Sequence, residues 1–119
     1  MNVAVSALGP TLEDKVDSRF GRTRYLIIAD SETGEFEVID NNANKSSMGG
    51  AGIGTAEIVS ERGVTAVVTG HLGPNAFKAL GAAGIPGYTG IGLTVREAVA
   101  AVAAGELEQL TQAGEAHAG

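Results

Sequence analysis

The segment that decides the fold class reads AVVTGHLGPNAFKAL and covers residues 66–80. Its first four residues are apolar or β-branched, which is typical of a buried strand. The glycine-rich turn at Gly70 leads directly to Pro74, and proline suits the first turn of a helix because its missing N–H costs little there. Gly84 then ends this helix. A buried strand joined to a helix in this way indicates an α/β protein.

The residues on either side continue this alternation. A glycine in the turn at residues 30–34 predicts an antiparallel hairpin between the strands around it, and Thr94 with Glu97 forms a capping-box pattern. The predicted strands are 3–7, 25–29, 36–38, 66–69 and 85–88, and the predicted helices run from about Gly54 to Glu61, from Pro74 to Gly84 and from Thr94 to Gly105. The order β-β-β-α-β-α-β-α predicts an α/β fold with a mixed five-stranded sheet in which the second strand is antiparallel.

Two of these strands carry signals of their position in the sheet. Phe36-Glu37-Val38 alternates apolar and polar residues, which predicts a strand with one buried and one exposed face. Pro86 interrupts the strand at 85–88, and an edge position is expected there because proline cannot donate to a sheet ladder.

The topology brings distant glycine-rich loops together. If the first, third, fourth and fifth strands run in the same direction, their carboxyl ends share one edge of the sheet, which is where open α/β sheets bind ligands. The loops expected at this edge are 8–23, 49–54, 70–74 and 89–92. Glycine lets the backbone approach a ligand closely, and a helix start offers unpaired N–H groups to an anion.

The composition narrows the classes of function. The chain has 119 residues, which fits one domain at 1–110 followed by a flexible C-terminal tail at 111–119. Its formal net charge of -6 argues against binding to nucleic acid or to an anionic membrane. The absence of cysteine excludes disulfides and thiolate metal sites. No apolar run is long enough for a membrane span, and the start goes into a strand without a basic leader, so a cytoplasmic protein is expected.

One basic cluster stands out in this acidic chain, namely Arg19, Arg22 and Arg24. Two interpretations stay open. The arginines are either solvated loop charges paired with Asp14 and Asp17, or clamps for an anionic ligand. The net charge argues little against the second interpretation, because salt screens remote carboxylates over about 8 Å.

His71 is the histidine expected at the binding edge, since it follows the fourth strand directly. It is a candidate for ligand binding or for acid–base chemistry. His117 lies in the tail and is expected to be inert. The two histidines are too far apart in the sequence for their spacing to indicate a zinc site.

The loop at 49–54 is rich in glycine but matches no nucleotide-binding signature. It lacks the Gly-Lys-Ser/Thr ending of a phosphate loop, and Thr55 replaces the third glycine of a dinucleotide fingerprint. The loop either captures an anion through its backbone N–H groups or is a flexible entry to a helix. Met48, just before it, is either a loop anchor or a soft thioether near a metal.

Catalysis finds little support in the sequence. There is no cysteine nucleophile and no Gly-x-Ser-x-Gly motif. A nuclease would need several carboxylates on the central strands to hold two metals, and residues 3–7 and 66–69 contain none. The chain is therefore not expected to be an enzyme.

Taken in order along the chain, these motifs resemble the small dinitrogenase iron–molybdenum cofactor biosynthesis proteins. The resemblance runs from residue 1 to about residue 107 and rests on NVAV at 2–5, RFGR at 19–22, GAG at 50–52, GHLGPNA at 70–76, and YTG at 88–90 before TVREA at 94–98. It implies a ribonuclease-H-like three-layer fold without nuclease activity. It also implies non-catalytic binding, carriage or storage of an anionic iron–sulfur or iron–molybdenum–sulfur cluster.

The resemblance also implies a set of site residues. His71 is the first candidate to coordinate metal and Met48 the second. The chain has neither the cysteines nor the His/Cys-rich tail that some members carry, so the resemblance implies a labile cargo held without thiolates. Proteins that donate or accept the cluster are the expected partners, and a monomer or weak homodimer is expected. The cluster-binding residues implied are Arg19, Phe20, Gly21, Arg22, Gly49, Gly50, Ala51, Gly52, His71, Gly73, Asn75, Thr89 and Gly90.

The same loops also suit functions of other classes. One is a small-anion or nucleotide-responsive interaction module that regulates a protein partner without metal. Another is a hydrolase with His71 as its base, which would lack both a nucleophile and an orienting carboxylate.

Overall fold

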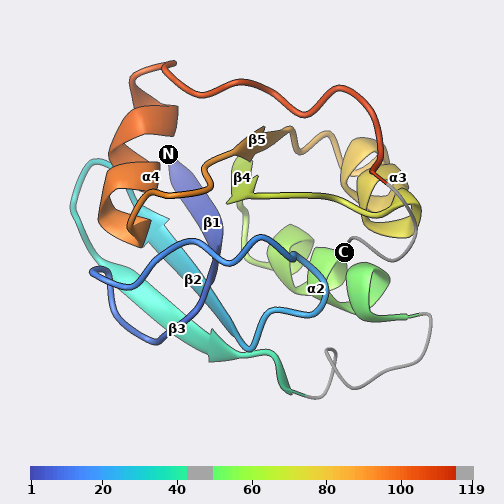
Figure 1. The fold of residues 1–119 in the computed structure, drawn as a ribbon, viewed down its shortest axis with the longest axis horizontal. Helices are drawn as coiled ribbons and strands as arrows, with labels where there is room; N and C mark the ends of the chain where they lie inside the picture. The colour runs from blue at the N-terminus through green and yellow to red at the C-terminus, as the bar shows by residue number, and fades with distance from the viewer. Residues whose placement is uncertain (43–49, 115–119) are drawn as a thin grey trace.

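A computed structural model of the chain describes residues 1–42 and 50–114. Figure 1 shows the course of the chain through these residues. The strands are β1 (Asn2–Ala7), β2 (Tyr25–Asp30), β3 (Phe36–Asp40), β4 (Ala66–Thr69) and β5 (Gly87–Thr89), and the helices are α2 (Ala51–Glu61), α3 (Pro74–Ala82) and α4 (Val95–Ala103). The predicted order of elements is confirmed.

The five strands form one mixed sheet in the order β3-β2-β1-β4-β5. β1 is parallel to β4, and β4 is parallel to β5. β2 is antiparallel to both of its neighbours, as predicted for the second strand. β1, β3, β4 and β5 therefore end at the same edge of the sheet, which we call the carboxyl edge.

Helices cover both faces of the sheet. α4 packs on the face that carries Val3 and Val5 of β1, through its own buried stripe of valine and alanine. α2 and α3 pack on the opposite face, against Ala4 of β1 and Val67 of β4. Figure 1 shows α4 on one side of the sheet and the α2–α3 pair on the other. Alternate side chains of the central strands therefore pack in two separate cores, one on each face of the sheet.

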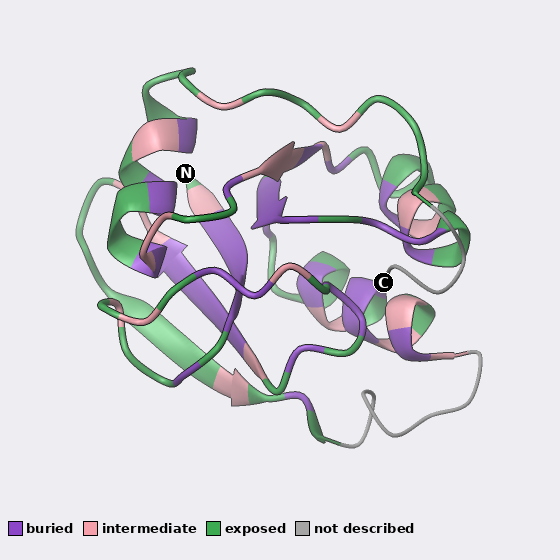
Figure 2. Ribbon diagram, in the orientation of Figure 1, coloured by how far each residue is buried: buried purple, intermediate pink, exposed green. Residues whose placement is uncertain are grey.

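The prediction that β3 buries its apolar face is wrong. Phe36 is 47% exposed and Val38 is 38% exposed, although both face the same side as the buried residues Ile27 and Ala29 of β2. α4 lies over β1 and β4 and leaves the outer strand uncovered. Figure 2 shows β3 as an exposed strand beside buried neighbours. The physical reason is its edge position, which the local alternation does not reveal.

The predicted start of the first helix is corrected by three residues, because α2 begins at Ala51 and not at Gly54. The amide of Gly54 donates to the carbonyl of Gly50 at 2.9 Å, so residues predicted as loop form the first helical turn. Glycine disfavours a helix by about 1 kcal/mol. Here close packing overrides this preference, since a Cβ on Gly52 would lie 2.9 Å from the Cβ of Ala76 on α3.

The segment after α4 covers the free side of β5. The amide of Thr89 donates to the carbonyl of Glu108 at 3.0 Å, and the amide of Leu110 donates to the carbonyl of Gly87 at 2.8 Å. The same segment is tied to the loop after β4, because the amide of Gly114 donates to the carbonyl of Leu72 at 2.8 Å. β5 is the last strand in the sheet order, as Pro86 predicts.

The predicted capping box of α4 is present. The hydroxyl of Thr94 accepts from the amide of Glu97 at 3.1 Å, and the Glu97 carboxylate accepts from the amide of Thr94 at 2.9 Å. Hydrogen bonding by the backbone amide of Thr94, and then by its hydroxyl, holds the pKa of the Glu97 carboxyl below its usual range. A lowered pKa in the folded state means that the contribution of Glu97 to stability is complete above the ordinary value of about 4.3 and fades as the pH falls through the folded value.

We therefore expect Glu97→Gln to flatten the dependence of unfolding free energy on pH in the acid range while leaving its slope near pH 7 unchanged. Urea unfolding at a series of pH values measures this. Glu57→Gln, an exposed change in α2, is the control and should keep the wild-type slope. An unaltered acid slope in Glu97→Gln would contradict the capping role.

No helix within residues 1–42 and 50–114 has the length and apolar character needed to cross a membrane.

Candidate functional site

Arg19 and His71 lie side by side at the carboxyl edge. The two residues form an isolated parallel bridge, in which the amide of His71 donates to the carbonyl of Ser18 at 2.8 Å. The contact depends on Gly70, because a Cβ there would lie 2.7 Å from the Cα of Ser18. The loop after β1 and the loop after β4 therefore meet where the topology predicts that they should.

A buried hydrogen-bond network anchors the first of these loops to the sheet. The hydroxyl of Ser6 on β1 lies 2.7 Å from the hydroxyl of Thr69 on β4 and 2.7 Å from the carbonyl of Asp17. The amide of Asp17 donates to the carbonyl of Ser6 at 2.7 Å. Ser6 and Thr69 are fully buried, so these bonds fix the backbone of Asp17 to the ends of β1 and β4.

Asp17 in turn holds Arg19. The residue is 3% exposed, and its carboxylate accepts from the backbone amide of Arg19 at 3.0 Å. It also accepts from the guanidinium, with Nε at 3.3 Å from Oδ1 and Nη2 at 3.4 Å from Oδ2. The Arg19 side chain nevertheless stays 53% exposed. The predicted pairing with Asp17 is confirmed for Arg19, whereas the carboxylate of Asp14 accepts from Thr11 at 2.8 Å instead.

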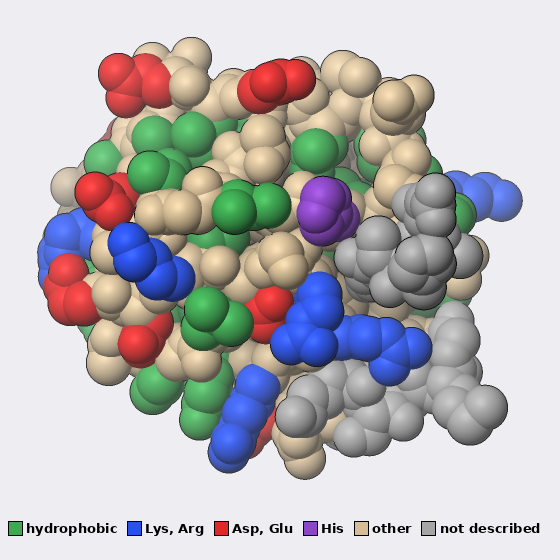
Figure 3. Space-filling view, viewed as in Figure 1, with side chains coloured by type: hydrophobic (Ala, Val, Ile, Leu, Met, Phe, Trp, Pro, Cys, Tyr) green, Lys and Arg blue, Asp and Glu red, His purple; other side chains and the backbone are tan. Residues whose placement is uncertain are grey.

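The imidazole of His71 is exposed at this edge and makes no hydrogen bond with residues 1–42 and 50–114. Beside it, Ile91 in the loop after β5 is 55% exposed, with its Cδ1 close above Gly70. Figure 3 shows the histidine side chain next to a group of Lys and Arg side chains and to apolar side chains. The edge thus combines positive charge, a free imidazole and an uncovered apolar surface.

The other two arginines of the cluster are exposed as well. The guanidinium of Arg24 lies over the ring of Tyr25, with 5.1 Å from its central carbon to the ring centroid. Arg22 lies between Arg24 and the buried core residue Phe20 in the sequence. All three arginines therefore come from one loop, and Arg19 is the one that the structure pairs with His71.

The remaining candidate residues fall into three groups. Phe20 is fully buried and packs in the core with α2 and α3, so its side chain supports the loop from inside. Gly21, Gly73 and Gly90 are buried backbone positions beside the edge, and Thr89 is half-buried in β5. Asn75 is exposed in the first turn of α3. Met48 and Gly49 lie outside the described residues.

Two helices begin at this edge without a side-chain cap. α2 starts from Gly50 and α3 from Gly73, and neither first turn contains an acidic residue. Ala51 and Gly52, which the sequence places in a loop, belong to α2. Ala51 is buried, and Gly52 packs against α3. The N–H groups of these first helical turns and the positive ends of the helix dipoles add to the positive character of the edge.

Few side chains of the described residues are placed to ligate a metal ion. These residues contain no group of three or more His, Cys, Asp or Glu side chains placed to hold a metal ion. The chain also has no cysteine. Of the predicted metal ligands, His71 lies within the described residues and Met48 lies outside them.

Sequence reasoning missed three features of the site. Ile91 was not singled out, and Asp17 was considered only as a loop charge. The Ser6–Thr69 pair was also missed, although it has a signal. Both are hydroxyl residues that directly follow the paired residues Val5 and Val68 of adjacent parallel strands.

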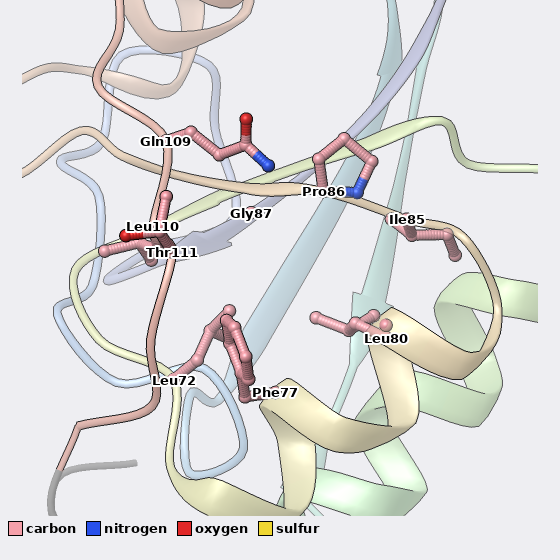
Figure 4. A pocket seen from close by; sticks show the side chains of 10 residues that line it. Leu72, Phe77, Leu80, Ile85, Pro86, Gly87, Gln109, Leu110 and Thr111 are labelled. Atoms are coloured by element: carbon pink, nitrogen blue, oxygen red, sulfur yellow. The ribbon is translucent and has the colours of Figure 1, made fainter.

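An apolar groove, also missed, lies beside the loop that carries His71. It has a volume of about 250 Å³ and opens between α3, β5 and the segment after α4. Figure 4 shows its lining, with Leu72, Phe77 and Leu80 on one side and Gln109, Leu110 and Thr111 on the other. The predicted elements could not reveal this groove, because the segment from 108 to 111 that closes it has no regular secondary structure.

Comparisons with known proteins agree with the α/β fold of the chain. The chain is 38% identical to the orange protein from Desulfovibrio gigas, solved in its apo form, with a TM-score of 0.90 over 96% of both chains. It is 36% identical to a putative NifB protein from Thermotoga, with a TM-score of 0.81 over 96% of this chain and 97% of that one. An uncharacterized protein from Methanocaldococcus jannaschii is 28% identical over 103 residues, which cover 84% of this chain and 86% of the other. The family model described as dinitrogenase iron–molybdenum cofactor matches residues 1–105, and the chain therefore belongs to this family.

Proposed function

We propose that this protein binds, carries or stores an anionic metal–sulfur cluster, of the iron–sulfur or iron–molybdenum–sulfur type, and does not catalyse a reaction. The observation that carries the proposal is the backbone bridge between Arg19 and His71, which brings an exposed guanidinium and an exposed imidazole to the same place at the carboxyl edge. Membership of the dinitrogenase iron–molybdenum cofactor family supports a role associated with such a cofactor.

The chemistry of the edge suits an anionic cluster. Sulfide and oxide atoms on the surface of a cluster accept hydrogen bonds, and those from a guanidinium are strengthened by its charge. Ile91 adds an apolar contact next to these donors. The name and the apo state of the orange protein suit a relative that takes up a coloured group. Because no thiolate can anchor the cargo, we expect it to exchange readily with donor or acceptor proteins.

The hydrolase alternative gains no support from the described residues. A histidine base is usually oriented by a carboxylate, and the buried carboxylate of Asp17 binds Arg19 instead. β1 and β4 carry no carboxylate, so the sheet also lacks the usual ligands of a two-metal nuclease. A mixed sheet with an antiparallel second strand and helices on both faces is consistent with the ribonuclease-H-like fold without that activity.

The test is reconstitution under anaerobic conditions. The purified protein is incubated with iron and sulfide, with and without molybdate, and then desalted before its visible absorption and metal content are measured. We expect retained colour at a fixed ratio of metal to protein. His71→Ala should lower this ratio severalfold without changing the unfolding transition, because the imidazole is exposed. Arg96→Ala, which truncates an exposed side chain paired with Glu13, is the control for a surface truncation.

Two outcomes would count against the proposal. A colourless, metal-free wild-type protein under every condition would remove the cluster function. Thermal shifts with a panel of nucleotides then test the regulatory alternative, because a ligand at 100 times its Kd should stabilise the fold by about 2.7 kcal/mol. An unchanged metal ratio in His71→Ala would remove His71 from the site.

A further inference from the structure

We propose that Asp17 is a positioning residue that fixes the Arg19 guanidinium as a two-pronged donor, so that the site prefers anions with two neighbouring acceptor atoms. The inference rests on the proposed function, which it deepens by naming the class of ligand surface and the residue that selects it. A bidentate guanidinium gives geometric specificity that a point charge lacks.

The contacts leave one side of the guanidinium free. Arginine has five N–H donors. The Asp17 carboxylate takes one from Nε at 3.3 Å and one from Nη2 at 3.4 Å. Within residues 1–42 and 50–114 three N–H groups remain without a partner, two on Nη1 and one on Nη2, and they lie on the side away from the Asp17 carboxylate. Since the Arg19 side chain is 53% exposed, this remaining edge is accessible to a ligand.

The residue that aims the guanidinium is buried, and its backbone is bonded to the sheet. The side chain of Asp17 is 5% exposed, and the Ser6–Thr69 hydroxyl pair holds its backbone carbonyl. The other ion pairs of the described residues, Arg96–Glu13 and Arg62–Glu37, are exposed on both partners. Among these three pairs only the Arg19 pair has a buried carboxylate, so only there is the orientation of the arginine set in advance.

The charge of Asp17 and its positioning role act in opposite directions on anion binding. As a negative charge beside the site, Asp17 repels an anion, and its removal should strengthen binding. As a positioning group, it spares the ligand the entropic cost of ordering a long arginine side chain, and its removal should weaken binding. The sign of the change in Asp17→Asn therefore separates the two roles.

The experiment measures molybdate binding to the purified protein by calorimetry. Molybdate is a tetrahedral dianion with neighbouring acceptor oxygens. We expect the affinity for molybdate to weaken about tenfold in Asp17→Asn, because the ligand must then order the Arg19 side chain itself. Arg19→Lys, which keeps the charge and loses the planar donor pair, should weaken it to a similar degree. Glu13→Gln makes the same charge change at an exposed arginine pair and should leave the affinity unchanged.

A second readout reports the arginine itself. The Nε–H proton of Arg19 should give a distinct, slowly exchanging NMR signal in the wild type, which disappears in Asp17→Asn while the other signals of the fold persist. In an Arg19→Gln background there is no guanidinium to position, so adding Asp17→Asn should strengthen molybdate binding. Unchanged or tighter binding in Asp17→Asn alone, or no molybdate binding by the wild type, would overturn the inference. Neither readout involves the metal–sulfur cluster, so failure of cluster retention by the wild type stays a separate result.

Discussion

Gly70→Ala is expected to lower the free energy of unfolding by about 3 kcal/mol, the upper end of the usual cost of overpacking. The added methyl group would lie 2.7 Å from the Cα and 2.8 Å from the carbonyl oxygen of Ser18, and 2.8 Å from Cδ1 of Ile91. Two of these three atoms belong to the backbone and cannot turn aside. The loop that carries Arg19 would have to move away from the loop that carries His71.

The same movement should also damage the site. It would break the bond from the His71 amide to the Ser18 carbonyl, now 2.8 Å, and separate the two residues proposed to contact the ligand. Urea unfolding with an unchanged m-value measures the loss of stability. Calorimetry with molybdate measures the damage to the site, at a temperature where the variant is still folded.

Gly81→Ala is the matched control for this prediction. Gly81 lies in α3, and a Cβ there would meet no atom within 4 Å. Because glycine disfavours a helix, this change should stabilise the protein by about 1 kcal/mol. Equal stability of Gly70→Ala and the wild type would show that the two loops do not pack as closely as described.

The sequence predicts best those elements whose signals are local. α4 has its capping box and its buried stripe within nine residues, and both are present as predicted. β3 and the start of α2 depend on tertiary surroundings. Phe36 is exposed because α4 packs mainly on β1 and β4, and Gly52 is helical because it allows α3 to approach. Neither fact can be read from the residues adjacent in the chain.

The candidate site likewise has features that the sequence predicts and features that depend on tertiary surroundings. The topology alone predicts that the loops after β1 and β4 meet, and the bridge between Arg19 and His71 confirms this. It does not predict the burial of Asp17, since a carboxylate in a polar loop usually remains in solvent. The burial follows from the loop lying flat on the ends of β1 and β4, where Ser6 and Thr69 bind its backbone. The positioning of Arg19 is therefore a property of the assembled edge.

Asn41→Ala is expected to be comparably destabilising, by about 3 kcal/mol, because it leaves buried acceptors without a donor. Asn41 follows β3 and is 1% exposed. Its side-chain amide donates to the carbonyl of Thr23 at 3.0 Å and to that of Gly21 at 3.3 Å, and it lies 3.0 Å from the hydroxyl of Thr55 on α2. One side chain thus joins the Arg19-bearing loop, the end of β3 and the first turns of α2.

Because Asn41 binds this loop, the effect of Asn41→Ala should be local and can be distinguished by amide exchange from a general loss of packing. The loop from Gly21 to Thr23 would lose a bond to the rest of the protein. Asn41→Ala should therefore speed the exchange of this loop's amides with solvent more than that of the β1 amides, and it should also lower the affinity for molybdate. Ser60→Ala, an exposed change in α2, is the control and should alter neither the stability nor the exchange of these amides. A uniform loss of protection across the sheet would instead mean that Asn41 stabilises the fold as a whole and has no particular hold on the loop that positions Arg19.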